Sequence, residues 1–332
     1  MKKNTKKKEK ASTIKTIFMG TGSFATPILS ALLDEGYNVT AVYTKVEGKI
    51  GRKDGMKERV KAHSPIVAIA KQHKIVIRQP SKFDDDTIAI FRKSAPDLVI
   101  VASYGKILPK EIVAYPTLGV VNVHASLLPK FRGPSPIQNA ILMGNKKSGI
   151  TLMLMDEGID TGAMIAQRSM PIGKDDLVGA VYKKLSSLGA NFLIETLPRF
   201  IAREITPQPQ NDRSATLCQI IDREDGHVQW HDEALMIYNR YRALTPWPGI
   251  FSFWKRKDGS LLRLKFGTIK PLRYTSGVAR KIGEVFAIDD MIGVQTFSDV
   301  IILENIQREG KKQLSSKDFL NGHPDFIGAI LR

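Results

Sequence analysis

The chain has 332 residues, of which 42% are hydrophobic and 25% are charged. This composition excludes a disordered or fibrous protein and is sufficient for two domains with buried cores. The formal net charge of +17 is unusual for a metabolic enzyme, so it favours a polyanionic partner, of which nucleic acid is the commonest.

The first 13 residues form a lysine-rich segment. A block of like charges cannot bury anything, so we expect a disordered tail over residues 1–13. The segment resembles the front of a signal peptide, but Lys15 and Gly20 interrupt the apolar residues that follow it. No window approaches the ~18 uninterrupted apolar residues of a membrane helix. The chain also has a single cysteine, Cys218, which excludes an internal disulfide, and together these features predict a cytoplasmic protein.

Alternating apolar strands and amphipathic helices begin at residue 14. The helices start at residues that favour a helix N-terminus, such as Ser64 followed by Pro65. We expect strands over 14–20, 37–44, 74–77, 96–103, 118–125, 148–156 and 162–172, and helices over 23–36, 64–73, 84–95, 136–144 and 176–200. This alternation predicts an α/β domain with a doubly wound, mostly parallel sheet over residues 14–203.

The pattern changes after residue 203. Residues 204–212 contain two prolines and no apolar periodicity, which predicts a linker. Over residues 213–332, short alternating strands are separated by turns, including a hairpin signal at Asp258, Gly259 and Ser260, with one helix over 233–244. The second domain is therefore expected to be a smaller, β-rich barrel or sandwich.

Basic residues gather in two parts of the chain. The loop over residues 44–65 contains seven Lys and Arg residues together with three glycines. Loops of this length in a compact domain are usually functional or disordered, so this one either clamps a phosphate backbone or has no role. Residues 255–281 hold nine basic residues and one acidic residue, Asp258. Both patches fit a nucleic-acid partner, and both also fit ordinary solvated faces.

The stretch GTGSFA, Gly20 to Ala25, fits the dinucleotide-binding pattern GxGxxA between a strand and a helix. On this pattern alone, the chain would be a nicotinamide-dependent reductase. However, Lys45 stands near the end of the second strand, where such proteins need an acidic residue for the ribose. A tight turn that lets the helix pack closely on the strand explains the glycines better.

The stretch NVHASLLPKFRG places Asn122 and His124 on one face of a strand, because side chains alternate with a period of two. Both lie at the carboxyl end of the strand, where open α/β sheets bind their ligands. Asp156, Glu157 and Asp160 follow a later strand and could orient the histidine. Such a set, without a Ser or Cys nucleophile, fits direct attack of a substrate amine on an acyl carbon. A capping histidine and a solvated acidic loop would give the same pattern.

Two motifs resemble the signature of the folate-dependent formyltransferase family: NVHASLLPKFRGPSPIQ, which starts at Asn122, and GIDTG, which contains Asp160. In addition, FMGTGSFATPILSALL near the start, and REDGHVQW and RALTPWPGIFSFW in the second domain, are similar to the family members that act on methionyl-tRNA. The resemblance covers residues 14–332. It implies that residues 213–332 form an OB-like barrel that helps to hold tRNA.

The resemblance also implies an activity and the residues responsible for it. The α-amine of initiator methionyl-tRNA would attack the formyl carbon of 10-formyltetrahydrofolate through a tetrahedral intermediate, without a metal. The catalytic residues would be Asn122, His124 and Asp160. The folate-binding residues would be Ser126, Leu127, Leu128, Pro129, Tyr104 and Ile107, and the tRNA-binding residues would be Arg52 and Lys53. We expect a monomer. The shared core motifs leave open another amine acceptor, such as a sugar nucleotide.

Overall fold

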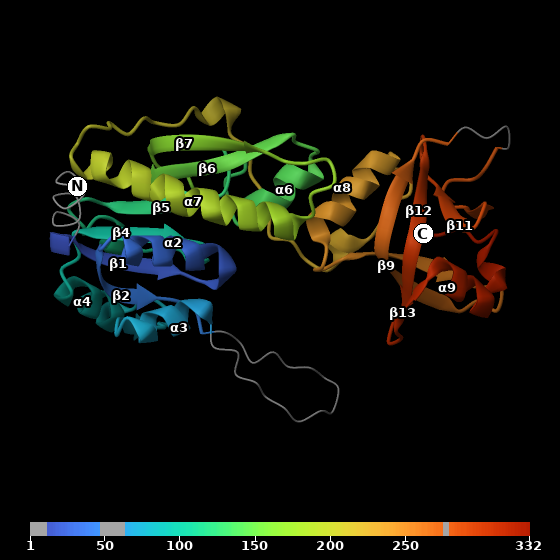
Figure 1. Cartoon of the computed structure of the whole chain (residues 1–332), viewed down its shortest axis with the longest axis horizontal. Coiled ribbons are helices and arrows are strands. Elements are labelled where there is room, and N and C mark those ends of the chain that lie inside the picture. Colours follow the sequence, from blue (N-terminus) through green and yellow to red (C-terminus); the bar gives the residue numbers. More distant parts are fainter. Residues whose placement is uncertain (1–11, 47–63, 275–278) are drawn as a thin grey trace, which may run out of the picture. The chain divides into compact units, whose positions relative to one another are not determined.

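The computed structural model describes residues 12–46, 64–274 and 279–332 (Figure 1). The chain divides into two compact units. The first contains the described residues up to Pro136 together with Lys147–Pro171 and Tyr182–Cys218, and the second contains Ile137–Lys146, Ile172–Val181 and Gln219–Arg332. Most of the predicted basic tail and of the predicted basic loop lies outside the described residues. Within the described ranges, no helix is both long enough and apolar enough to cross a membrane.

The described part of the first unit is built on a seven-stranded sheet in the order β3-β2-β1-β4-β5-β6-β7 (Figure 1). The strands are β1 Lys15–Gly20, β2 Asn38–Tyr43, β3 Val76–Arg78, β4 Leu98–Ala102, β5 Val120–His124, β6 Lys147–Leu154 and β7 Met164–Pro171. Strands β1 to β5 run parallel, whereas β6 is antiparallel to both β5 and β7. The mostly parallel, doubly wound sheet predicted from the sequence is confirmed.

The helices of the first unit are α2 Gly22–Asp34, α3 Pro65–Gln72, α4 Asp85–Lys93, α5 Lys110–Val113 and most of α7 Val178–Ile201. The part of α7 in this unit begins at Tyr182. The carboxylate of Asp84 caps α4 by accepting a hydrogen bond from the backbone N–H of Thr87 at 3.1 Å. Ser64 occupies the equivalent position before α3, but its hydroxyl makes no capping bond. Helix α5 was not predicted, because four residues are too few to show helical periodicity.

The two faces of this sheet pack against different helices. On one face Met19, Val101 and Val120 share a core with Phe91 of α4 and Ile112 of α5. Side chains alternate along β5, so Asn122 and His124 lie on the same face as Val120. Val123 points the other way, and its side chain lies beside Gly189 of α7. Helix α7 runs along the sheet in Figure 1.

The second unit is an antiparallel β-rich structure, as the sequence predicts. In its described part, β10 Val285–Ile288, β11 Met291–Gln295, β12 Val300–Arg308, β9 Leu261–Leu272 and β8 Ile250–Lys255 form a sheet in that order, and β13 Gln313–Ser315 pairs with β12. Its helices are α6 Pro136–Leu142, α8 Ala234–Leu244 and α9 Ser316–Gly322. The first residue of α6, Pro136, belongs to the first unit. The predicted hairpin is confirmed, because β8 and β9 pair antiparallel on either side of Asp258, whose carboxylate accepts from the N–H of Ser260 at 2.9 Å.

Residues 204–212, which the sequence analysis assigned to a linker, lie in the first unit. Gln208 forms an antiparallel bridge with Met164, with N–H to carbonyl distances of 2.9 and 2.8 Å. The segment therefore follows the edge of the sheet beside β7. The predicted boundaries at residues 14–203, 204–212 and 213–332 stay predictions.

Candidate active site

The carboxylate of Asp160 joins three groups of the first unit. Asn122 Nδ2 donates a hydrogen bond to Oδ1 at 3.2 Å, and the backbone N–H of Gly133 donates to Oδ2 at 2.8 Å. His124 Nδ1 lies 3.5 Å from the same Oδ2. The side chains of His124 and Asp160 are 6% and 14% exposed, so little water competes for these contacts. The structure thus brings together the three residues that the sequence analysis predicted to be catalytic.

The second ring nitrogen of His124 is also engaged. Its Nε2 lies 3.0 Å from the backbone carbonyl oxygen of Phe131, which can only accept, so Nε2 carries a proton. The carboxylate of Asp160 lies on the other side of the ring, 3.5 Å from Nδ1, so the ring of His124 is held between two oxygen acceptors. Asn122 Nδ2 carries two N–H groups, and the bond to Asp160 uses one of them.

Asp160 lies in the loop that connects β6 to β7. Its backbone φ is +54°, a left-handed conformation that is uncommon for a residue other than glycine. Two residues later, a Cβ on Gly162 would come within 1.7 Å of the carbonyl oxygen of Leu154, so only glycine fits there. Asp156 organises the loop from within, by accepting from the N–H of Gly158 at 3.1 Å and from Thr161 Oγ1 at 2.7 Å.

The predicted folate-binding turn follows β5 directly. Ser126 is fully buried, and its hydroxyl donates to the carbonyl of Lys130 at 2.7 Å. Thr151 on β6 holds the turn, because its Oγ1 donates to the Ser126 carbonyl at 2.7 Å and accepts from the N–H of Leu128 at 3.1 Å. Gln167 on β7 donates from Nε2 to the Leu128 carbonyl at 2.7 Å and to Thr151 Oγ1 at 2.9 Å. Leu127 and Pro129 are left half-buried at the surface of the turn.

The other predicted site residues are placed differently. Tyr104 and Ile107 follow β4, whose Val101 pairs with Asn122 of β5, so they start from the same edge of the sheet. Tyr104 is 2% exposed in the core, its hydroxyl has no partner among the described residues, and burial raises its pKa to about 12. Ile107 is 82% exposed. Arg52 and Lys53 lie outside the described residues.

Four supporting side chains were missed by the sequence analysis: Arg132, Thr151, Gln167 and Gln210. Thr151 and Gln167 are paired across β6 and β7. Thr151 gave a usable signal, because it is the single polar residue in the apolar run 150–154 of β6. Gln167 gave none, because Arg168 and Ser169 follow it on β7. Gln210 could not be found in this way, because it lies in a segment without periodicity and its contacts are distant in sequence.

The glycine turn after β1 shows tight packing. A Cβ on Gly20 would lie 2.6 Å from Phe18 Cε1 and 2.7 Å from the Cβ of Ala25, so the glycine allows α2 to approach the strand. The backbone N–H of Lys45 donates to Thr21 Oγ1 at 3.2 Å. These contacts support the packing interpretation of the motif over a nicotinamide site.

Comparison with known families decides the assignment. Residues 14–197 match the family model described as formyl transferase, and residues 220–324 match that of the formyl transferase C-terminal domain. The chain belongs to the formyl transferase family. This membership excludes the nicotinamide-dependent reductase as the interpretation of GTGSFA.

Relatives of this formyl transferase are similar over nearly its full length. A protein named methionyl-tRNA formyltransferase from Caldanaerobacter subterraneus subsp. tengcongensis is 38% identical, and the match covers 96% of this chain and 100% of that protein. Another of the same name, from Enterococcus faecalis, is 38% identical over 93% of this chain and 96% of its own length.

Solved structures of other formyltransferases share the fold. The N-formyltransferase from Helicobacter canadensis, in complex with folinic acid and dTDP-3-aminofucose, matches with a TM-score of 0.61 at 20% identity. The match covers 89% of this chain and 99% of that one. HypX from Aquifex aeolicus in complex with tetrahydrofolic acid also gives a TM-score of 0.61, at 17% identity, over 95% of this chain and 48% of that one.

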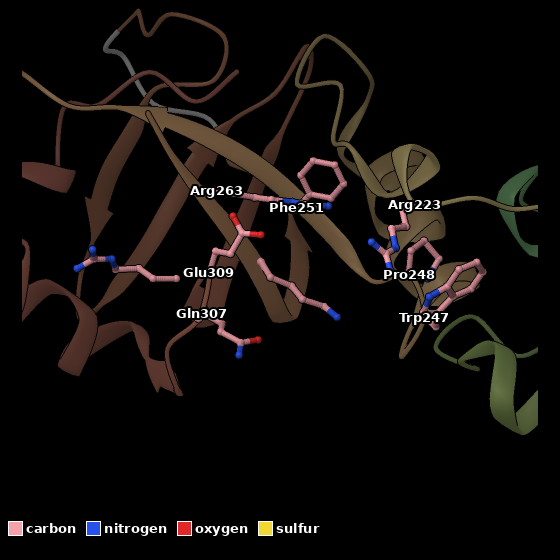
Figure 2. Close-up of a pocket in the computed structure, with 10 residues that line it drawn as sticks. Arg223, Trp247, Pro248, Phe251, Arg263, Gln307 and Glu309 are labelled. Atoms are coloured by element: carbon pink, nitrogen blue, oxygen red, sulfur yellow. The ribbon is translucent and has the colours of Figure 1, made fainter. Parts of the chain in front are cut away.

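The second unit of this formyl transferase contains a basic pocket of about 360 Å³. Among the described residues that line it, the charged side chains are Arg223, Arg263, Lys265, Arg308 and Glu309. The guanidinium of Arg263 lies over the ring of Phe251, 3.6 Å from its centroid, and Arg223 lies beside Pro248 and Trp247 (Figure 2). Trp247 is 58% exposed. Cationic groups next to an exposed aromatic ring suit a phosphate backbone and a base.

Proposed function

We propose that this chain transfers the formyl group of 10-formyltetrahydrofolate to the α-amine of initiator methionyl-tRNA, as a cytoplasmic monomer. The observation that carries the proposal is the 38% identity to the Caldanaerobacter methionyl-tRNA formyltransferase, over 96% of this chain and all of that protein. Both units are included in this match. The sugar N-formyltransferases, at 20% identity or less, support the shared fold alone.

The residues around Asp160 suit a transfer without a covalent enzyme intermediate. When the amine nitrogen bonds to the formyl carbon, the formyl oxygen becomes an oxyanion. The free N–H of Asn122 Nδ2 can donate to it, and a protonated His124 beside it would stabilise its negative charge; a preorganised donor is worth about 3 kcal/mol. Asp160 keeps His124 oriented and, through a water, receives the proton that the amine loses. That proton passes to N10 of the folate when the bond between N10 and the formyl carbon breaks.

The turn over residues 126–129 fits a folate mainly by shape. The carbonyl of Ser126 and both backbone groups of Leu128 are already bonded to Thr151 and Gln167. The half-buried side chains of Leu127 and Pro129 are left to contact an apolar ring. We therefore assign Ser126 and Leu128 to holding the turn, and Leu127 and Pro129 to contacting the folate, together with Tyr104 and Ile107 from the neighbouring strand end.

Two basic surfaces are proposed to bind the tRNA. One is the pocket around Arg263 and Lys265 in the second unit. The other is the predicted basic loop with Arg52 and Lys53, which lies outside the described residues. Neutralising Arg52 and Lys53 together should raise KM for tRNA and leave KM for the folate unchanged, because the formyl donor does not depend on phosphate contacts at that loop.

A direct assay tests the proposed function. Purified protein is incubated with 10-formyltetrahydrofolate and initiator methionyl-tRNA, and formylmethionyl-tRNA is measured. A parallel reaction offers an amino-sugar nucleotide in place of the tRNA. Formylation of the tRNA supports the proposal. Formylation of the sugar nucleotide alone would show that the acceptor is wrong, although the formyl donor is right.

A further inference from the structure

The side chain of Gln210 joins the Asp160 loop to a buried arginine. Its Nε2 donates to the carbonyl oxygens of Asp160 and Gly162, both at 2.8 Å. Its Oε1 accepts from Arg132 Nε at 3.0 Å and from Arg132 Nη2 at 2.9 Å. A guanidinium only donates, so Oε1 must face Arg132 and Nε2 must face the two carbonyls. The orientation of the amide is thus determined by its neighbours.

Arg132 is itself firmly held. It is 6% exposed, and its Nη2 also donates to Asp212 Oδ1 at 2.6 Å. The backbone of Arg132 is bonded to the segment that follows Gln210. The N–H of Arg132 donates to the carbonyl of Thr216 at 2.9 Å, and the N–H of Cys218 donates to the carbonyl of Arg132 at 2.8 Å. A side chain bonded in this way provides a fixed point from which Gln210 can hold the loop.

The Asp160 loop needs such support because of its conformation. A left-handed φ at a residue other than glycine costs roughly 1–3 kcal/mol and persists only where the surroundings impose it. Asp160 has φ +54°, and the adjacent Ile159 is 62% exposed. The described contacts hold Asp160 at two points: Asn122 and Gly133 bond its carboxylate, and Gln210 bonds its carbonyl. Loss of the hydrogen bond from Gln210 to the Asp160 carbonyl would let the carboxylate move away from Asn122 and His124.

We infer that Gln210 is a positioning residue for formyl transfer, which acts by holding the backbone of Asp160 so that its carboxylate meets Asn122 and His124. This inference rests on the proposed role of Asp160. Gln210 touches neither substrate in this scheme. Its loss should therefore lower kcat and leave both KM values nearly unchanged.

The variant Gln210→Glu separates the two ends of the side chain. It has the same shape and keeps an acceptor for Arg132, but it replaces the donor that faces the two carbonyls with an oxygen that repels them. Gln208→Glu is the matched control. It makes the same change two residues away, on an exposed side chain whose Nε2 donates to the Thr206 carbonyl at 3.0 Å.

Rates of the chemical step are measured under single-turnover conditions with enzyme in excess, and kcat and KM under steady-state conditions, in the wild-type and Asp160→Asn backgrounds. We expect Gln210→Glu to lower the wild-type rate about 10- to 100-fold, the cost of a misplacement of about 1 Å. We expect Gln208→Glu to leave it unchanged. In the Asp160→Asn background, Gln210→Glu should have no further effect, because residues that act as a unit are not additive.

Three results would overturn the inference: an unchanged rate in Gln210→Glu, an equal loss in the Asp160→Asn background, or a loss confined to KM. Full activity of Asp160→Asn alone would refute the proposed site itself, whatever Gln210 does. Circular dichroism checks folding. If Gln210→Glu does not fold, Gln210→Met provides the same comparison, since it removes both polar ends without adding a charge.

Discussion

Asn122 and Asp160 are 38 residues apart in sequence, and the side-chain amide of the first donates to the carboxylate of the second at 3.2 Å. The bond crosses from β5 to the loop between β6 and β7. It orients the Asn122 amide, so that its second N–H has a defined direction. The strand and the loop therefore form one site, in which the carboxylate is shared between an amide and an imidazole.

Replacing Asp160 with Asn should abolish most of the activity without unfolding the protein. The amide has the volume of the carboxylate and can still accept from the N–H of Gly133, but it carries no charge to hold a protonated His124 and cannot take the amine's proton. We expect kcat to fall roughly 100-fold or more, a typical contribution of acid–base catalysis. Steady-state kinetics and circular dichroism measure the two effects.

Glu157→Gln is the control for this change. Glu157 lies in the same loop, its side chain is 66% exposed, and it pairs with Lys110 at 2.9 Å. Such an exposed pair contributes little to stability. The control should keep wild-type kcat. A comparable loss in both variants would mean that loop charge in general, and not the Asp160 carboxylate, supports the reaction.

Replacing Gln167 with Met should weaken binding of the formyl donor. The change removes the hydrogen bonds from Gln167 to Leu128 and Thr151 that hold the 126–129 turn. We expect KM for 10-formyltetrahydrofolate to rise about 10-fold, equivalent to the loss of about 1.4 kcal/mol of binding. The KM for tRNA should not change. Ser169→Ala, on the same strand, is the control, and an increase in both KM values would contradict a role at the folate turn.

Neutralising the basic pocket should weaken tRNA binding alone. In the double variant Arg263→Gln, Lys265→Gln, KM for tRNA should rise and KM for the folate should stay the same. The dependence of binding on salt should also become shallower, by about one unit of the logarithmic slope for each phosphate that the variant no longer neutralises. Lys317→Gln, on an exposed lysine of α9 outside the pocket lining, is the control. An unchanged salt slope in the double variant would exclude the pocket as a phosphate site.

Much of the first unit and part of its site could be predicted from local sequence. The two-residue period of β5 was enough to place Asn122 and His124 on one face, and both do reach Asp160. Capping preference alone was a weaker guide. Asp84 caps its helix, whereas the hydroxyl of Ser64 at the equivalent position makes no capping bond.

The support of the site could not be predicted, because it depends on contacts between distant segments. Gln210 bonds to Asp160 across 50 residues and to Arg132 across 78. Its own surroundings, two prolines and no apolar period, are typical of a linker. Local patterns carry no information about such contacts, so a segment whose sequence is typical of a linker can still hold the loop that carries Asp160.

The stability of the second unit should fall as the pH drops below about 6.5, and His323 should account for part of the loss. Burial and the nearby Arg308 and Arg256 lower the pKa of His323, against a smaller opposing effect of Asp325. The unfolded chain therefore binds a proton at a higher pH than the folded one, so acid favours unfolding. All three tryptophans lie in this unit, and their fluorescence reports its unfolding in urea. His323→Gln keeps an acceptor for Arg308 but does not titrate. It should lose less stability between pH 7.5 and pH 5.5 than the wild type, and an equal loss in both proteins would show that His323 does not contribute.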